Sequence, residues 1–480
     1  MKTLQIEKLL EIGISLSSCR DSALVLREIL DTAMDLTECD AGTLYILENN
    51  ALSFYIMVTK SMGVDRGGNG MKIDLPPVPL SAVNVCAKAA LDKRIINIVD
   101  VYEDDRFDFS GPRRYDDMTG YRTGSMLVIP MTDERGDVVG VLQLLNALDC
   151  FGNRIPFPKE CEQVISSLAS QAAIRLTNLN YSREIVTLLE SMVQVTSTAI
   201  DARSPYNANH SKNMAKYGGN FLQWLQEKKH PYQLTEDESK ELLMAIWLHD
   251  MGKLITPLEV MNKPTRLGPA EEKIKDRFRI MSLLNELRFA QGNMDQNTYQ
   301  TSLEELRDAE EIIFQANSAG FLKDDLLQKI QNIGQKTYID EKGSEKPWLT
   351  EQELHALSVR KGTLTAEERV VMENHVVMTE KLLSQMHFTR EYSHVREYAS
   401  SHHELLNGAG YPRHLVAEQI PFQVRVLTIL DIFDALTAKD RPYKAPMSTE
   451  QAFSILDSMA RDGQLDADIL ELFKESKAWE

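Results

Sequence analysis

Apolar residues at the start of the chain recur every three or four positions, and this spacing then changes. Leu9, Ile12 and Leu16 belong to a helix that the pattern predicts over residues 1–35. After it, apolar runs separated by turn residues predict two β-hairpins. Their four strands cover Ala41–Leu47, Ala51–Thr59, Ser125–Met131 and Val138–Asn146. With a closing helix over 162–178, the pattern indicates an α+β sandwich of about 175 residues.

A long helical stretch leads out of this predicted sandwich. Between Val164 and Ile200, apolar positions approximate a heptad seam that Ser182 interrupts. These positions are Ile165, Leu168, Ala172, Leu176, Leu179, Val186, Leu189, Val193 and Ile200. The pattern fits either a parallel two-helix connector between protomers or one amphipathic helix that packs on its own domain. We favour the connector, because the stretch joins two otherwise distinct regions.

From about residue 200 the spacing is helical throughout, which predicts an all-α C-terminal part. One run, about 268–360, is polar and acidic but keeps helical spacing, so we expect a helical insertion with a loop at Gly343–Pro347. The predicted organisation is therefore a sandwich domain over 1–176, a connecting helix over 177–204 and a helical domain over 205–480.

The composition is that of a soluble globular protein of two or three domains. The 480 residues are 43% hydrophobic and 26% charged, with a net charge of −18. This acidic balance argues against binding a nucleic-acid polymer, which needs a basic surface, but it allows a small phosphorylated ligand. The five cysteines form no Cys-x-x-Cys pair, and the sequence has no signal-peptide core or long apolar run. We therefore expect a cytoplasmic protein with reduced thiols and no membrane segment.

The helical part carries histidines and aspartates on apolar stripes. Leu242–Leu248 is apolar on nearly every side, which predicts a buried helix, and it leads directly into His249 and Asp250. Burying such groups without partners is costly, and a transition metal satisfies imidazole and carboxylate together. Taken singly, such a residue is more often a hydrogen-bonded core group. Five further residues share the pattern, namely His210, His375, His402, His403 and Asp431.

So many histidines and aspartates turned inward from separate helices predict a shared metal centre. We expect His402 and His403 to lie on a helix, where their side chains point about 100° apart. They would then reach opposite sides of one centre, or two ions.

A series of residues spread over the predicted sandwich matches a domain signature. It comprises Asp100, Asp104-Asp105-Arg106-Phe107, Gly120, Arg122, Ser125, Pro130, Gly136, Gly140-Val141-Leu142-Gln143 and Asn146. In this order the residues resemble a GAF domain, closest to those of cyclic-nucleotide phosphodiesterases. That family has an Asn-Lys…Phe…Asp-Glu signature after the last hairpin, of which this chain keeps Asn146, Phe151 and Glu160 but has Ala147 at the lysine position. The resemblance implies a domain that binds a cyclic nucleotide or another small ligand, or one that serves only for dimerisation.

The helical part contains several short motifs in a set order. They are His249-Asp250-Met251-Gly252-Lys253, His402-His403-Glu404, Gly408-Ala409-Gly410-Tyr411-Pro412, Asp431 with Asp434-Ala435-Leu436-Thr437, and Arg441-Pro442-Tyr443. The series resembles the HD-GYP phosphodiesterase family over about 200–270 and 360–470. The resemblance implies hydrolysis of a cyclic dinucleotide, chiefly cyclic di-GMP, to linear pGpG and further to GMP. It also implies a centre of two or three metal ions, iron first and manganese as the alternative.

Carried over position by position, the resemblance implies a role for each residue. The metal ligands would be His210, His249, Asp250, His375, His402, His403 and Asp431. Asp250, bridging two ions, and Lys253, contacting the scissile phosphate, would be the catalytic pair. The residues that bind substrate would be Lys253, Gly410, Tyr411, Arg441 and Lys444.

Two departures from the family pattern change the expected site. Family members with three metals have a glutamate four residues before the first histidine, where this chain has Tyr206. We therefore predict two divalent ions. The insertion separates His249 from His375, and the motif order makes His375 the ligand, whereas we expect His355, in the polar insertion, to be solvated.

Three interpretations of function remain open from the sequence. The first is a GAF-regulated hydrolase of cyclic di-GMP. The second is a non-catalytic receptor that binds a cyclic dinucleotide and acts through protein partners, and the third is a hydrolase that prefers cyclic GMP-AMP. We also expect a homodimer that forms through the connecting helix and the GAF domain, with the insertion as a lid or a dimer contact.

Overall fold

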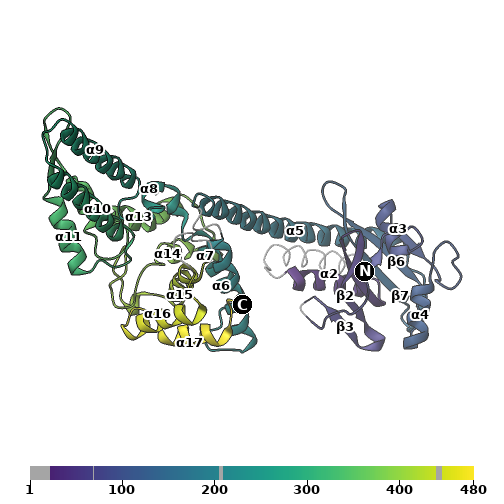
Figure 1. Ribbon diagram of the computed structural model, residues 1–480. Helices are drawn as coiled ribbons and strands as arrows, with labels where there is room; N and C mark the ends of the chain where they lie inside the picture. The colour runs from purple at the N-terminus through teal and green to yellow at the C-terminus, as the bar shows by residue number, and fades with distance from the viewer. Residues whose placement is uncertain (1–21, 69, 205–208, 439–445) are drawn as a thin grey trace. The chain divides into compact units, whose positions relative to one another are not determined.

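The computed structural model describes residues 22–68, 70–204, 209–438 and 446–480. These residues divide into two compact units, with the division between Leu188 and Leu189. The N-terminal unit contains a β-sheet, and the C-terminal unit is almost entirely helical (Figure 1).

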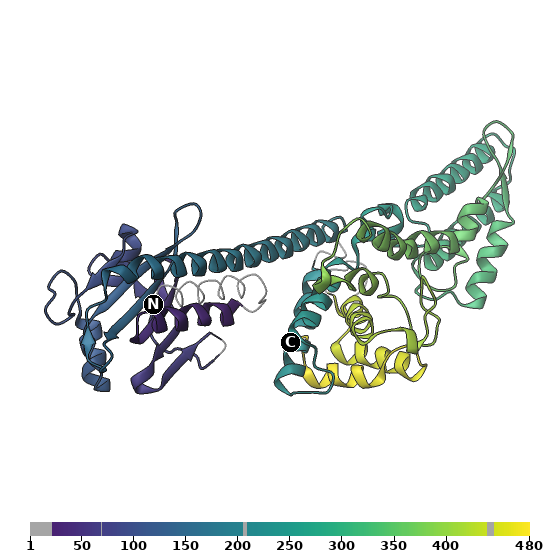
Figure 2. The ribbon, with the colours of Figure 1, turned by 180° about the vertical axis from the view of Figure 1, so that it is seen from behind.

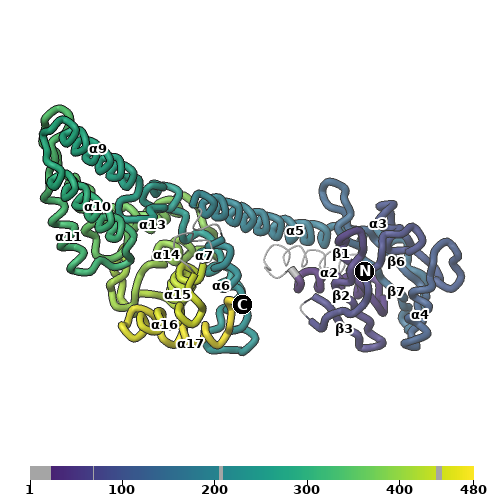
Figure 3. Tube along the Cα trace, in the orientation of Figure 1, coloured from purple at the N-terminus to yellow at the C-terminus, as the bar shows by residue number. Residues whose placement is uncertain are grey.

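The N-terminal unit is built on an antiparallel sheet with the strand order β3-β2-β1-β7-β6-β5. Figure 3 traces the chain through β1, β2, β3, β6 and β7 of this sheet. The strands are β1 (Cys39–Glu48), β2 (Ala51–Thr59), β3 (Val64–Gly67), β5 (Ile96–Ile98), β6 (Met126–Thr132) and β7 (Val138–Leu148), with β4 (Val78–Pro79) beside β2 and β8 (Arg154–Ile155) beside β7. Both predicted hairpins are confirmed. Pairing of β1 with β7 joins them into one sheet.

Helices cover both faces of this sheet. Helix α2 (Ser22–Leu36) and the first part of α5 (Lys159–Asp201) share one core with the sheet, and α3 (Val85–Asp92) shares the other. Leu127 and Val128 belong to opposite cores, because successive side chains of a strand point to opposite faces. The α+β sandwich is confirmed, and it adds α3 and α4 (Ser110–Thr119) in the stretch between the two hairpins. Residues 1–21 of the predicted first helix lie outside the described residues.

Helix α5 carries two different apolar stripes. The predicted seam residues are largely buried, with Ile165, Leu168, Ala172 and Leu176 in the sheet core and Val193 in a core of the C-terminal unit. These residues therefore pack within the chain, as expected for one amphipathic helix that packs on its own domain. A second stripe, which we call the outer stripe, is exposed. It consists of Ile185 (66% exposed), Leu188 (62%), Met192 (60%) and Val195 (69%).

The C-terminal unit is helical, as predicted, apart from one small hairpin. Around the site its elements are α6 (His210–Glu227), α7 (Glu236–Leu248), η2 (Met251–Leu254), α8 (Leu258–Met261), α13 (Ala366–Leu383), α14 (Val395–Ala399), α15 (Phe422–Thr437), α16 (Thr449–Arg461) and α17 (Ala467–Ser476). Helices α6, α7, α15, α16 and α17 share one core, and α7 and α14 contribute to a second. Figures 1 and 2 show α15 in the middle of this group. None of the helices in the described residues is both long and apolar enough to cross a membrane.

The polar run at 268–360 folds around a core of its own. Its helices are α9 (Ala270–Ala290), α10 (Gln296–Ser318), α11 (Asp324–Gly334) and α12 (Glu351–Leu357). A short hairpin joins β9 (Thr337–Ile339) to β10 (Glu345–Pro347), so the loop predicted at Gly343–Pro347 is wrong for its last three residues. At the base, the buried Arg266 donates hydrogen bonds to the carbonyl oxygens of Val359 and Ala316, both at 2.8 Å, which ties the two ends of the insertion together.

Candidate metal centre and ligand cavity

Helix α7 delivers His249 and Asp250 to the interior of the C-terminal unit. His249 is the C-terminal cap of the helix, Asp250 follows it, and both side chains are buried. Thr379 of α13 holds this corner, because its hydroxyl donates to the carbonyl of His249 (2.9 Å) and accepts from the amide of Gly252 (2.8 Å). The turn η2 is thereby fixed against α13 at the level of His375.

Three buried histidines are oriented by the same kind of hydrogen bond. The Nδ1 atoms of His249, His375 and His402 lie 2.7, 2.6 and 2.7 Å from the backbone carbonyl oxygen three residues earlier. A carbonyl oxygen only accepts, so Nδ1 carries the proton and Nε2 presents its lone pair to the centre. The Nε2 atoms of His375 and His402 are 3.3 Å apart. Two facing lone pairs repel, whereas two nitrogens that bind one ion at about 2.0–2.1 Å lie about 3.0–3.4 Å apart.

His210, the first residue of α6, is held between carboxylates of α15. Its Nδ1 lies 2.7 Å from an oxygen of Asp434, and its Nε2 lies 3.3 Å from an oxygen of Asp431 and 3.2 Å from Nε2 of His249. Asp431 and Asp434 are three residues apart on α15 and so occupy the same side of the helix. A carboxylate on the outer nitrogen of a histidine fixes the ring and makes the inner nitrogen a better metal ligand.

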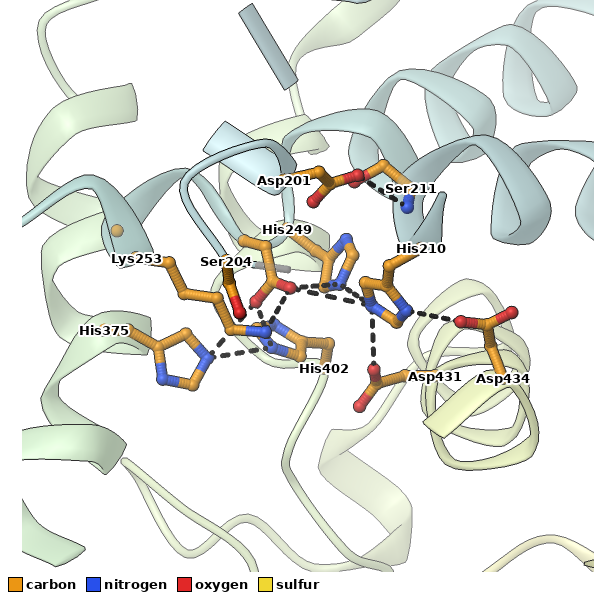
Figure 4. A network of polar contacts seen from close by, with 12 residues as sticks. Asp201, Ser204, His210, Ser211, His249, Lys253, His375, His402, Asp431 and Asp434 are labelled. Atoms are coloured by element: carbon orange, nitrogen blue, oxygen red, sulfur yellow. Dashed lines mark hydrogen bonds and ion pairs between the residues drawn. The ribbon is translucent and has the colours of Figure 1, made fainter. Parts of the chain in front are cut away.

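Asp250 lies between two pairs of histidines, His210 with His249 and His375 with His402, which Figure 4 labels. Its Oδ2 atom is 3.2 Å from Nε2 of His249 and 3.6 Å from Nε2 of His210. Its Oδ1 atom is 3.5 Å from Nε2 of His375 and 3.9 Å from Nε2 of His402. Among the described residues this buried Oδ1 has no hydrogen-bond partner. A buried carboxylate oxygen that faces unprotonated nitrogens fits a bound cation, because burial without one is costly.

The groups of the centre shift the pKa values of one another. Burial favours a higher pKa for Asp250, but the neighbouring His249 and Lys253 outweigh it and hold that pKa well below its usual range. Burial lowers the pKa of His403 to about 3. Burial also disfavours the charged form of His210, yet the carboxylate of Asp431, with that of Asp434, raises the pKa of His210 to about 10. Ionised carboxylates with mostly neutral imidazoles are the donors that first-row divalent cations prefer.

His402 and His403 lie in a turn after α14, which ends at Ala399, so the prediction that they lie on a helix is wrong. They still face different neighbours. Nδ1 of His403 is 3.6 Å from Asp431, and its ring centroid is 4.8 Å from that of Tyr411. After this turn the buried Glu404 faces the next loop, where its carboxylate accepts from the amide of Arg413 (2.7 Å).

The Gly408–Pro412 loop folds back against the same turn. The amide of Tyr411 donates to the carbonyl of His403 at 3.1 Å. A side chain at Gly410 would not fit, because an added Cβ would lie 2.6 Å from Cα of Glu404 and 2.6 Å from the carbonyl oxygen of His403. Gly410 thus allows the close approach that places the Tyr411 ring beside His403.

The predicted metal ligands form three overlapping groups, each with ligand atoms within 4.8 Å of one another. The groups are His210 with His249 and Asp431, His375 with His402 and His403, and His249 with Asp250 and His402. All seven predicted ligands belong to at least one group. The donor types, the orphaned oxygen of Asp250 and the facing nitrogens fit divalent metal ions, and the ligand role of each residue stays a prediction.

Other predicted residues lie elsewhere or outside the described residues. Tyr206, Arg441 and Lys444 fall in the undescribed segments. The side chain of His355 is 59% exposed and lies 3.2 Å from Glu367, in agreement with a solvated residue. Sequence reasoning gave no role to Asp434, although its spacing of three from Asp431 was a signal that both face one side of the helix.

Replacing Asp434 with asparagine is expected to weaken binding of Mn(II) about 10- to 100-fold, because the histidine ligand loses the carboxylate that orients it. Titration calorimetry with Mn(II) measures this change. Asp457→Asn is the matched control, since Asp457 pairs with Lys474 on the surface of α16. Equal affinities for the wild type and Asp434→Asn would exclude the role assigned to Asp434.

A second candidate site is a cavity of about 450 Å³ in the N-terminal unit. Its volume lies in the range of about 300–1,000 Å³ that small-ligand sites occupy. The lining is mainly aromatic and apolar, with Tyr45, Phe54, Phe109 and Tyr115 among its side chains. Tyr45 donates to Gln143 at 2.9 Å, which adds a polar position to the wall. Such a lining suits a planar organic ligand.

Asn146 of the GAF signature forms hydrogen bonds with a segment that lines this cavity. Its side chain donates to the Tyr121 hydroxyl and the Arg122 carbonyl, both at 2.8 Å, and accepts from the amide of Gly124 at 2.7 Å. Tyr121 lines the cavity, whereas Asn146 is not among the residues that line it. The role of Asn146 here is to hold the 121–124 segment, and cyclic-nucleotide binding stays a prediction.

Comparison with known proteins identifies one domain in the N-terminal part of the chain and one in the C-terminal part. The GAF domain family matches residues 21–176, and the HD domain family matches residues 351–469. Over 103 residues the chain is 34% identical to 3'3'-cGAMP-specific phosphodiesterase 3 of Vibrio cholerae, which covers 22% of each protein. Over 106 residues it is 35% identical to a cyclic di-GMP phosphodiesterase of Thermotoga maritima, covering 21% of this chain and 27% of the relative.

Each of these alignments therefore spans no more than about a quarter of the relative. Among solved structures, the GAF domain of an Acinetobacter phosphoenolpyruvate-protein phosphotransferase has a TM-score of 0.30 and 16% identity, over 38% of this chain and 99% of that one. The two family matches place a GAF domain at residues 21–176 and an HD domain at residues 351–469.

Proposed function

We propose that this protein is a metal-dependent phosphodiesterase that hydrolyses cyclic di-GMP to linear pGpG and further to GMP. One observation carries the proposal, namely the position of the Asp250 carboxylate, with each oxygen facing a different pair of histidine nitrogens. A shared carboxylate of this kind suits two cations a few ångströms apart, an arrangement used for phosphodiester hydrolysis. The activities for which the two aligned relatives are named support a cyclic dinucleotide as the substrate class.

The residues divide naturally between two ions. His210, His249 and Asp431 would hold one, His375, His402 and His403 the other, with Asp250 shared. Iron suits this imidazole and carboxylate set, with manganese as the alternative. When bound, the ions supply Lewis acidity toward the phosphoryl oxygens.

Side chains around the ions would bind and orient the substrate. Lys253 places its ammonium 2.5 Å from Oδ2 of Asp250, where it would neutralise negative charge that develops on the scissile phosphate. Tyr411, which packs beside His403, would contact the dinucleotide from the Gly410 loop. We keep Arg441 and Lys444 as the residues for the second phosphate.

Cyclic GMP-AMP is the second candidate substrate, because one aligned relative is named for that activity and the other for cyclic di-GMP. Both substrates present the same two phosphates to the centre and differ in one base. A non-catalytic receptor is the alternative in which the same residues bind the dinucleotide without turnover.

The test uses the full chain, stripped of metal and reloaded with Fe(II) or Mn(II). With cyclic di-GMP, chromatography is expected to show pGpG first and GMP later, and competition with cyclic GMP-AMP ranks the two substrates. Tight binding with no product over hours would favour the receptor. Repeating the assay with cyclic GMP or cyclic AMP addresses regulation, since a ligand of the GAF cavity is expected to change the rate.

We assign the domains as 1–176, 177–204 and 205–480, with the connecting helix as the contact between two copies of the chain. The outer stripe of α5 is the observation that supports this dimer. Ile185, Leu188, Met192 and Val195 follow one another at spacings of three, four and three, as the core positions of a two-stranded coiled coil do, and all four are exposed.

Replacing Leu188 and Val195 together with glutamate is expected to convert the dimer to a monomer, because opposed carboxylates would face each other in an apolar seam. Sedimentation velocity measures the change. Arg183→Glu is the matched control, since Arg183 is exposed on α5 outside the stripe. A wild-type chain that sediments as a monomer, or a double variant that stays dimeric, would overturn this interface.

A further inference from the structure

The turn that contains Lys253 is too short to fix its own position by internal hydrogen bonds. Lys253 lies in η2, a single 3-10 turn of four residues between α7 and α8. Such short turns make few internal hydrogen bonds, so their position depends on what surrounds them. On one side, Gly252 donates to Thr379 of α13 at 2.8 Å.

On the other side, Arg203 binds the carbonyl end of the same turn. Its Nη1 donates to the carbonyl oxygen of Lys253 at 2.6 Å and also to that of Leu254, and its Nη2 donates to that of Thr256 at 3.5 Å. A guanidinium presents its donors in a rigid plane, which suits several acceptors on one turn. Arg203 therefore fixes the backbone from which the Lys253 side chain extends.

Arg203 lies in the turn after α5, and both the end of α5 and this turn are anchored in the C-terminal unit. The buried Asp201 accepts from the amide of Ser211, the residue after His210, at 3.0 Å. The Ser204 hydroxyl donates to the side chain of Asn262 at 2.6 Å. Figure 4 shows Asp201 beside Ser211, with Lys253 extending toward the histidines. The segment after α5 thus has fixed points on both sides of Arg203.

We propose that Arg203 is a positioning residue that sets where the Lys253 ammonium lies relative to Asp250. Lysine has four flexible side-chain bonds, so its ammonium stays at one place only if its backbone is fixed. The Lys253 ammonium is 2.5 Å from Oδ2 of Asp250, a distance that a shift of η2 would change. A misplacement of about 1 Å at a reacting centre costs about 100-fold in rate. The inference rests on the proposed function, since it concerns the lysine that would contact the scissile phosphate.

The test compares Arg203→Gln and Arg203→Lys with Arg183→Gln, which changes an exposed arginine on α5. Arg203→Gln is expected to keep the metal content of the wild type, because no metal ligand contacts Arg203 through its side chain, and to lower kcat about 30- to 100-fold. Arg203→Lys is expected to recover only part of this loss, since an ammonium cannot reproduce the planar set of donors. Arg183→Gln should match the wild type.

A double-mutant cycle separates positioning from general damage to the fold. If Arg203 acts through Lys253, then Arg203→Gln should change kcat less than about 3-fold in a Lys253→Ala background. Equal losses in both backgrounds, or loss of metal from Arg203→Gln and Arg203→Lys alike, would overturn the proposal.

A second readout works even if cyclic dinucleotides are not hydrolysed. Calorimetry measures the affinity of the Mn(II)-loaded proteins for inorganic phosphate. This affinity depends on the position of the Lys253 ammonium and needs no turnover. If Arg203→Gln weakens phosphate binding in the wild-type background but not in the Lys253→Ala background, the positioning role is supported even where the proposed function has failed. The positioning role is contradicted if Lys253→Ala weakens phosphate binding while Arg203→Gln binds phosphate with the affinity of the wild type.

Discussion

Replacing Asp250 with asparagine is expected to lower kcat/KM for cyclic di-GMP by at least about 1,000-fold, since it would disturb both the proposed metal pair and the charge stabilisation around it. The carboxylate offers one oxygen to each pair of histidine nitrogens, whereas an asparagine turns an NH₂ group toward one pair. It also removes the negative charge that faces Lys253 and would lie between two cations. Elemental analysis is expected to show fewer than two ions per chain, alongside the loss of product in the turnover assay.

Asp237→Asn is the control for this experiment, because Asp237 lies exposed in the first turn of the same helix. It should keep both metal content and turnover. Full metal content together with wild-type turnover in Asp250→Asn would show that the centre does not depend on a shared carboxylate. Loss of turnover with two ions retained would instead assign Asp250 to substrate chemistry alone.

The sequence predicts best those parts of the centre that depend on the pattern of neighbouring residues in the chain. An apolar run that ends in His249-Asp250 marks a buried helix end, and the structure places both side chains in the interior. The contact of His210 with Asp434 joins positions that are far apart in the chain, and it depends on how α6 packs against α15. The spacing of Asp434 from Asp431 places both on one side of α15, but no spacing within either helix encodes the contact of Asp434 with His210.

Helix α5 shows a second limit of pattern reasoning. It has apolar residues on two sides, and periodicity alone cannot tell which side faces its own domain. The core takes the side with Leu168 and Ala172, where the residues are small or pack against the sheet, and leaves Leu188 and Val195 exposed. The strand at Glu345–Pro347 escaped prediction for a related reason. Three residues are too few for a period, and their pairing with Thr337–Ile339 defines the strand.

Replacing Gly252 with alanine is expected to lower the free energy of unfolding by about 3 kcal/mol or more, as overpacking against backbone does. An added Cβ would overlap the carbonyl oxygen of His375 and lie 2.6 Å from the amide nitrogen of Thr379. Both are main-chain atoms of α13 and cannot rotate away. To relieve the overlap, η2 must move off α13, which separates His249 and Asp250 from His375.

The same change is therefore expected to remove metal as well as stability, and thermal unfolding with elemental analysis measures both. Gly219→Ala is the matched control, because Gly219 lies inside α6 and an added Cβ there meets nothing within 4 Å. Alanine at that helical position is expected to stabilise the protein by about 0.5–1 kcal/mol. If Gly252→Ala melted like the wild type with its metal intact, the close contact between η2 and α13 would not be what holds the two halves of the centre together.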